Sequence, residues 1–147
     1  MEARSKSIGV ARMYALIFGI AYLGVALTEV ILGKSGWNID GATILKITAL
    51  QNAVHWLVGV VVLGSFFAGE MAARWVARVI GGVFVILTVW GFVARDSLGS
   101  FLGFSGPLPW SYNIVHLLTA IAALIAGFAV SRLYGATEPG PQKRLAT

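Results

Sequence analysis

The chain has 147 residues, of which 58% are apolar and only 12% are charged. Soluble domains are about 45–50% apolar and about 25% charged, so this composition excludes an ordinary soluble domain, and the hydrophobicity excludes a disordered chain. The lack of cysteine excludes disulfides, iron–sulfur clusters and thiolate zinc sites. A small polytopic membrane protein remains, and we assign its net charge of +5 to topology and lipid head groups rather than to nucleic acid.

Apolar segments of roughly 20 residues can cross a bilayer, and the chain contains four candidates. In chain order, the predicted spans are about 13–32, 53–68, 76–94 and 111–130. Together they predict one transmembrane domain, residues 1–131, followed by a polar cytoplasmic tail, 132–147.

The segments between the spans are rich in glycine or proline, which interrupt helices. The first loop extends from residue 33 to about residue 51, and its half-apolar later part, 44–50, could lie along the membrane interface. A short turn at about 69–74 joins the second span to the third, and a longer loop at 95–110 precedes the fourth.

The distribution of Lys and Arg predicts the orientation in the membrane. Eight of the 11 lie in the two termini and the middle turn, and three lie in the two longer loops. Because cytoplasmic segments carry the excess of Lys and Arg, we expect both termini in the cytoplasm and the longer loops outside. The expected location is the bacterial plasma (inner) membrane.

A short motif occurs twice and contains the only two histidines. Asn52-x-x-His55 and Asn113-x-x-His116 each open a span from the outer side, and an Ala-Arg pair at 11–12 recurs at 77–78. These matches predict a duplication of two helical hairpins, about 11–68 and 77–130, related by a pseudo-two-fold axis along the membrane normal. The predicted fold is an all-α, four-helix transmembrane bundle built from two parallel repeats.

With these motifs, the chain resembles the DUF4383-type family, bacterial (actinobacterial) four-helix integral membrane proteins of unknown function. The resemblance extends from about Arg12 to Phe128, and the first copy of the motif continues to Gly59 as the family pattern does. The second copy departs from it, because Ala120 stands at the glycine position. The resemblance implies the four-helix membrane fold and brings no activity.

The repeated motif has a structural interpretation and two chemical ones. Asn52 and Asn113 are expected to be helix N-caps, with His55 and His116 in the first turn and hydrogen-bonded across the pseudo-two-fold axis. Alternatively, the two histidines could hold a haem by both axial positions. A metal site would need further ligands, for which the outer carboxylates of Glu29 and Asp96 are the candidates.

The outer ends of the first and third spans carry Glu29, Arg95 and Asp96. Charges at such interfaces are usually solvated, and a Glu29–Arg95 pair would link the two hairpins modestly. A proton or ion path would need an ionisable residue near the middle of the membrane, and the spans have no charged residue there.

Small residues recur at four-residue spacing in two spans, which lets membrane helices approach closely. They include Ala15 and Gly19 in the first span and Ala123 and Gly127 in the fourth. These stripes could build the bundle itself or dock it against another protein.

Catalytic motifs are missing, so we do not expect an enzyme. The favoured role is an accessory or stabilising subunit of a larger membrane complex, for example in lipid transport, the cell envelope or respiration. It would use the small-residue stripes and the apolar residues of the second outer loop, which are Phe101, Leu102, Phe104, Leu108 and Trp110. The alternative is a stand-alone membrane protein that binds a lipid, a quinone or a haem through the paired histidines.

Overall fold

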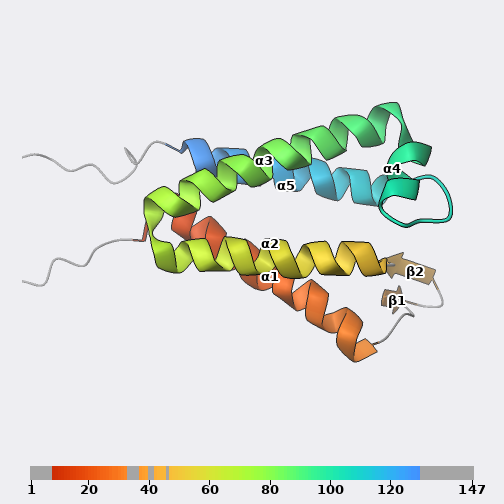
Figure 1. Ribbon diagram of the computed structural model, residues 1–147, viewed down its shortest axis with the longest axis horizontal. Helices are drawn as coiled ribbons and strands as arrows, with labels where there is room; N and C mark the ends of the chain where they lie inside the picture. Colours follow the sequence, from red (N-terminus) through yellow and green to blue (C-terminus); the bar gives the residue numbers. More distant parts are fainter. Residues whose placement is uncertain (1–7, 33–36, 40–41, 46, 130–147) are drawn as a thin grey trace, which may run out of the picture.

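The computed structural model describes residues 8–32, 37–39, 42–45 and 47–129 (Figure 1). In chain order, the elements are α1 (Val10–Leu32), β1 (Trp37–Ile39), β2 (Ala42–Leu45), α2 (Ala49–Ala68), α3 (Glu70–Val93), α4 (Arg95–Phe101) and α5 (Trp110–Phe128). Helices α1, α2, α3 and α5 are long and apolar enough to cross a membrane, which confirms the predicted four-span helical fold. The predicted tail, 132–147, lies outside the described residues.

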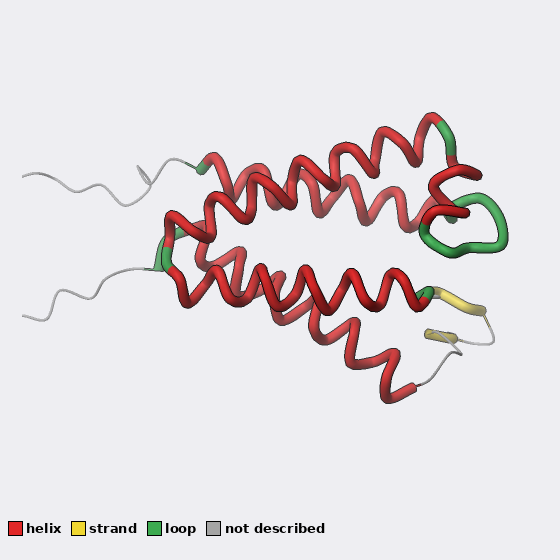
Figure 2. Tube along the Cα trace, in the orientation of Figure 1, coloured by secondary structure: helices red, strands yellow, loops and turns green. Residues whose placement is uncertain are grey.

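The described chain folds as two helical hairpins, α1 with α2 and α3 with α5 (Figures 1 and 2). The hairpins meet mainly where α3 passes α1 and α2. The start of α1, the α2–α3 turn and the end of α5 lie together at what we call the turn end (Figure 1). The strands and α4 lie at the opposite loop end. Which side of a membrane each end faces stays a prediction.

The first loop is more ordered than the sequence predicted. Strands β1 and β2 pair antiparallel, with Asn38 opposite Thr43 and Ile39 opposite Ala42, so 42–45 is a strand; its position at the membrane interface stays a prediction. Helix α2 then begins at Ala49, four residues before the predicted span, because Thr48 forms a capping box with Gln51. The Thr48 hydroxyl accepts from the Gln51 amide at 3.2 Å, and the Gln51 side chain accepts from the Thr48 amide at 3.0 Å.

The turn between α2 and α3 is much shorter than the predicted 69–74. Helix α3 already begins at Glu70, which leaves Gly69 as the connecting residue. Its φ of 110° lies in the region that residues with a side chain rarely adopt. Glycine at this position therefore lets two spanning helices follow each other almost without a loop.

Small residues pack the helices inside each hairpin. A Cβ added at Gly19 of α1 would lie 2.7 Å from Leu63 Cβ of α2, and one at Gly127 of α5 would lie 2.8 Å from Arg78 Cγ of α3. Ala15 and Ala123 are buried in the main core. The small-residue stripes are therefore used within the bundle and are not free to dock another protein.

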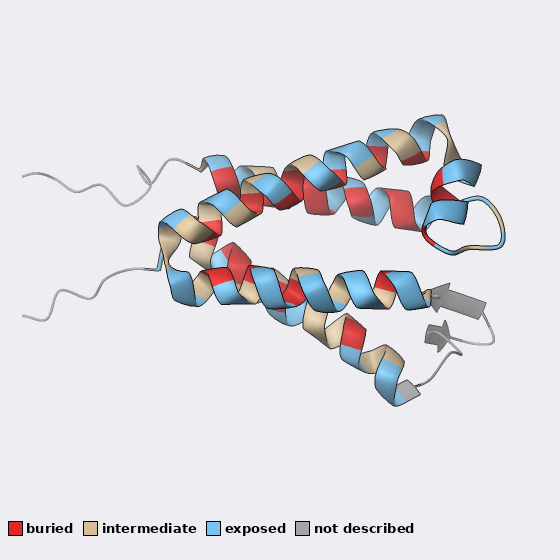
Figure 3. Cartoon of the chain, viewed as in Figure 1, coloured by how far each residue is buried: buried red, intermediate tan, exposed pale blue. Residues whose placement is uncertain are grey.

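The outside of the bundle is apolar. Buried positions lie on the facing sides of the helices, and exposed positions cover the outer sides (Figure 3). Many exposed side chains are large and hydrophobic, among them Ile31, Phe67 and Val93. Such an exterior suits contact with lipid chains.

Candidate functional site

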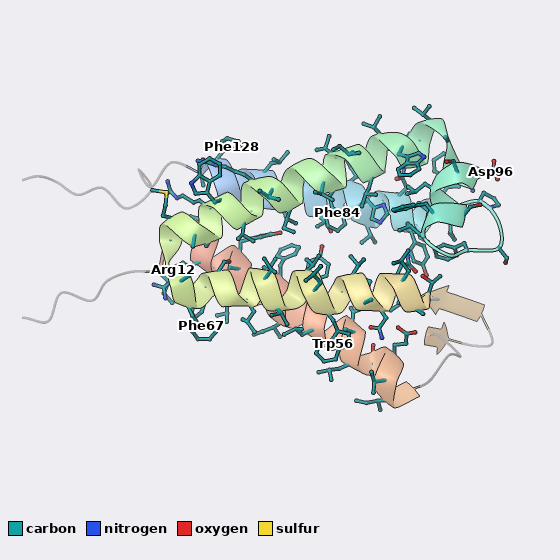
Figure 4. All side chains as sticks on the ribbon, in the orientation of Figure 1. Arg12, Trp56, Phe67, Phe84, Asp96 and Phe128 are labelled. Atoms are coloured by element: carbon teal, nitrogen blue, oxygen red, sulfur yellow. The ribbon has the colours of Figure 1, made fainter. Side chains whose placement is uncertain are left out.

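The turn end carries matching structural contacts in the two hairpins. Arg12 Nε donates to the Phe66 carbonyl at 3.0 Å, and Arg78 Nε donates to the Gly127 carbonyl at 2.9 Å. Each guanidinium also lies over a ring near the end of the partner helix, at 4.8 Å for Arg12 and Phe66 and 4.7 Å for Arg78 and Phe128 (Figure 4). A duplication of the hairpin would produce such a match. The duplication itself stays a prediction.

Glu70 joins the start of α3 to the start of α1. Its carboxylate accepts from the backbone amides of Ala11, at 3.3 Å, and Arg12, at 3.1 Å, and pairs with Arg74 at 3.1 Å. A carboxylate at a helix N-terminus satisfies free backbone donors and complements the helix dipole. These charged groups are thus occupied in holding the helices together.

The repeated Asn–His motif lies deeper in its helices than predicted. Asn52 and Asn113 are the fourth residues of α2 and α5, not their N-caps. Thr48 caps α2, while Pro109 precedes α5 and makes no capping hydrogen bond through its side chain. The capping prediction was therefore wrong, because both helices begin several residues upstream of the motif.

The two motif copies hold most of the buried polar atoms that lack a hydrogen-bond partner in the described part of the chain. Asn113 is 1% exposed, with both amide atoms unpartnered, and His116 is 9% exposed, with Nδ1 unpartnered. Asn52 Oδ1 is likewise buried and unpartnered, and the buried His55 Nδ1 has no hydrogen bond of normal geometry, although the Gln51 backbone lies close enough to interact with His55. We call these four residues the Asn/His quartet. The expected hydrogen bonds of the histidines across the pseudo-two-fold axis do not form through these Nδ1 atoms.

A chain of aromatic rings connects the two histidines. The His55 ring lies 5.7 Å from Tyr22 of α1, and the His116 ring lies 5.5 Å from Phe84 of α3. Tyr22 and Phe84 are themselves 6.3 Å apart, and Phe84 points from α3 toward the other hairpin (Figure 4). All four helices that could span the membrane thus contribute a ring to one cluster.

Gly91 of α3 provides the space for the Asn113 side chain. A Cβ at Gly91 would lie 2.2 Å from Asn113 Oδ1 and 2.7 Å from its Cγ. Sequence reasoning missed Gly91, Tyr22 and Phe84 as neighbours of the motif. The signal was weak, because a glycine, a tyrosine and a phenylalanine inside apolar spans are usually packing residues.

The predicted outer-interface charges form no ion pair with one another among the described residues. Arg95 Nε donates to the Leu108 carbonyl at 3.0 Å, and its guanidinium lies 4.3 Å above the Trp110 ring. Glu29 Oε2 is buried and has no partner among the described residues, so the Glu29–Arg95 pair does not form there. Asp96 is exposed at the loop end (Figure 4).

The second of the two longer loops folds onto itself, contrary to the expectation that its apolar residues are all exposed. Leu102 and Leu108 are buried in a small core with Leu98 and Tyr112. The loop can close because α4 turns the chain back, so that the Leu108 amide donates to the Arg95 carbonyl at 3.1 Å. The loop residues that stay exposed include Phe101 and Trp110, at 57% and 49%.

One hydrogen bond ties this loop to the other hairpin. The Thr48 hydroxyl at the start of α2 donates to the Leu102 carbonyl, at the end of α4, at 2.5 Å. Thr48 thus both caps α2 and joins the two hairpins at the loop end, close to the helix starts that carry the quartet.

Different observations argue against the metal interpretation and the haem interpretation. Within the described ranges, no group of three or more His, Asp or Glu side chains is arranged to hold a metal ion. Two histidines alone leave a zinc or copper site short of ligands. A haem held by both His55 and His116 would have to displace Tyr22 and Phe84, whose rings link the two imidazoles.

Comparison with known proteins gives one match. The family model described as a domain of unknown function (DUF4383) matches residues 40–129, more than half of the chain. The matched range contains both copies of the Asn–His motif. No curated protein and no solved structure matches the chain.

Proposed function

Since the chain belongs to the DUF4383 family, whose description assigns no activity, we propose a function from its own residues. It is a non-enzymatic membrane protein that binds a lipid-soluble small molecule through the Asn/His quartet. The polar head group of this molecule lies between the loop-end halves of the two hairpins, and its apolar part faces the lipid.

The observation that carries this proposal is the set of unpartnered polar atoms. Asn113 is almost completely buried, yet neither its amide oxygen nor its amide nitrogen has a partner among the described residues. Leaving a buried polar group unsatisfied costs about 1–3 kcal/mol, and such groups are rare in folded proteins. Because little water reaches this depth of a membrane, a bound head group is a natural source of the lost hydrogen bonds.

The arrangement of the helices supports a shared site. Asn52 and His55 come from one hairpin, and Asn113 and His116 come from the other. The aromatic chain through Tyr22 brings the two pairs into one cluster. Ligands often bind between the helices of a bundle, where a few polar groups converge inside an apolar surround.

We infer that the site opens toward the outer side of the bacterial plasma membrane, with both termini in the cytoplasm. The excess of Lys and Arg in the termini and the middle turn supports this orientation. The start of α1 and the end of α5 lie at one end, as the orientation requires (Figure 1). A lipid-soluble molecule would then enter from the outer leaflet.

The test is to identify what the purified protein carries. We would isolate the protein in a mild detergent, exchange the detergent and measure retained small molecules by mass spectrometry. A double His55→Phe, His116→Phe variant keeps an aromatic ring at both positions but removes the ring nitrogens. A double Ser100→Ala, Ser111→Ala variant changes two exposed loop-end hydroxyls and is the matched control.

We expect one class of small molecule at near-stoichiometric amount in the wild type and in the serine control. The double histidine variant should retain at least tenfold less, while its helix content and melting temperature stay close to those of the wild type. Equal retention by the histidine variant would overturn the proposal. So would a wild-type protein that carries no defined molecule and takes up none from added lipid extract.

A second proposal is the accessory role in a larger membrane complex, such as one for lipid transport, the cell envelope or respiration. Two aromatic side chains favour this role, because Phe101 and Trp110 both stay exposed at the loop end. A pull-down at native expression level would recover larger membrane proteins in fixed stoichiometry. A double Phe101→Ser, Trp110→Ser variant should lose them, and recovery of the chain alone would reject this role.

A further inference from the structure

The free atoms of the Asn/His quartet also indicate a class of ligand, an inference that rests on the proposed function. We infer that the site takes an uncharged, planar head group with oxygen atoms at its edge, as in the quinone–quinol class. Three properties of the described residues lead to this assignment, namely charge, hydrogen-bonding capacity and the surrounding rings.

Among the residues that the structure describes, the charges give no support to an anionic head group. Of the cations that the structure describes, Arg12, Arg74 and Arg78 lie at the turn end, and each has its own partner. Arg95 at the loop end is engaged with the Leu108 carbonyl and the Trp110 ring. Burying an anion without a cation is far more costly than burying a neutral polar group. A phosphate head group therefore lacks a counter-charge among these residues.

The unpartnered atoms can both donate and accept hydrogen bonds. Asn113 offers the donor group Nδ2 and the acceptor Oδ1, and Asn52 offers the acceptor Oδ1. His116 offers Nδ1, which donates or accepts according to its tautomer. These atoms can therefore donate to a carbonyl oxygen of a quinone and accept from a hydroxyl of the corresponding quinol.

The rings around the quartet favour a flat partner. The His55, Tyr22, Phe84 and His116 rings follow one another at centroid distances of 5.7, 6.3 and 5.5 Å. These distances lie within the range of about 4.5–7 Å in which aromatic groups attract each other. The ring pairs are tilted or edge-to-face, at interplanar angles of 34°, 42° and 64°. A planar head group can add a further contact of this kind, whereas the glycerol backbone of an acylglycerol, which is neutral but not flat, cannot.

The experiment compares three probes on the whole protein in phosphatidylcholine nanodiscs. They are a decyl-substituted benzoquinone, a short-chain diacylglycerol and a short-chain phosphatidylglycerol. Bound probe is quantified by mass spectrometry after gel filtration, and empty nanodiscs give the background partitioning. The variants are Asn113→Leu and His116→Phe, with Ser111→Ala as the exposed control on the same helix.

We expect saturable binding of the benzoquinone at one per chain, with the Kd raised at least tenfold in both quartet variants and unchanged in Ser111→Ala. The probe should also raise the melting temperature of the wild type and not that of the variants. If Asn113→Leu fails to fold, His116→Phe alone decides the result, because it keeps the ring.

The other outcomes distinguish a wrong ligand class from a wrong proposed function. Quartet-dependent binding of diacylglycerol or phosphatidylglycerol, without binding of the benzoquinone, would overturn the ligand class and leave the proposed function standing. Benzoquinone binding that both quartet variants retain would overturn the inference, since the quartet would not form the site. Binding of no probe above the empty-nanodisc background would also overturn the inference, and analysis of retained molecules would then decide the proposed function.

Discussion

Replacing Gly91 by alanine tests whether the Asn113 amide occupies the position that the binding proposal needs. The new Cβ would lie 2.2 Å from Asn113 Oδ1, 2.7 Å from Cγ and 3.2 Å from Nδ2. Because Asn113 is buried, its amide cannot simply swing into open space. Gly82 on the same helix is a matched control, since a Cβ there meets nothing within 4 Å.

The expected magnitude follows from this comparison. Both substitutions add one methyl group to α3, and the gain in helix propensity, up to about 1 kcal/mol at the central Gly82, is smaller at Gly91 in the last turn. Only Gly91→Ala overpacks its surroundings, which costs about 1–3 kcal/mol. The free energy of unfolding of Gly91→Ala should therefore be about 1–3 kcal/mol below that of Gly82→Ala.

The assay is equilibrium unfolding in mixed micelles, followed by circular dichroism, together with measurement of the retained small molecule. We expect Gly82→Ala to retain the ligand. Gly91→Ala should retain at least tenfold less of it, because the Asn113 amide is displaced. Indistinguishable unfolding free energies for the two variants would show that the Asn113 side chain does not lie against Gly91. Unchanged ligand retention in a destabilised Gly91→Ala variant would show that Asn113 does not contact the ligand.

Three further predictions concern contacts that hold the bundle together. Thr48→Val removes the cap of α2 and the hydrogen bond to the Leu102 carbonyl. Thermal unfolding in detergent should therefore show a free energy of unfolding lower by about 1–2 kcal/mol. An unchanged melting temperature would contradict this. Glu70→Gln should destabilise the protein more than Arg74→Gln, because the carboxylate also accepts hydrogen bonds from two backbone amides of α1, while Arg74 supplies only the ion pair. Equal losses of unfolding free energy would show that the two amide contacts contribute nothing. Gly69→Ala should cost about 1–2 kcal/mol in the same assay because of its positive φ, and a neutral result would mean that the turn adopts another conformation.

The extent of the helices was only partly predictable from local signals. Hydropathy located all four spans, since the preference of a segment for a bilayer depends mainly on its own composition. Their starts were misplaced where capping decides them. The Thr48–Gln51 capping box is visible in the sequence, yet the neighbouring apolar residues 44–50 suggested an interfacial segment. Strand β2 takes the first part of that segment because β1 supplies a pairing partner.

The candidate site was predictable as a motif but not as an environment. The repeated Asn-x-x-His pattern identified Asn52, His55, Asn113 and His116, and its helical spacing placed each pair on one face. Their assigned roles as caps and cross-axis hydrogen bonds were not found, because both roles depend on where the helices begin and which partners lie opposite. Gly91 and Phe84 could be connected to the motif only through the packing of α3 on α5.

The sequence by itself determined the class of protein, the number of spans and the residues of the repeated motif. These properties are local, because each segment carries its own hydropathy and each motif its own spacing. The tertiary structure alone decided that the small-residue stripes pack inside the hairpins, that Leu102 and Leu108 are buried, and that the amide of Asn113 has no partner among the described residues. Those outcomes depend on how helices distant in the sequence cross, and the crossing is set by side chains on both helices at once.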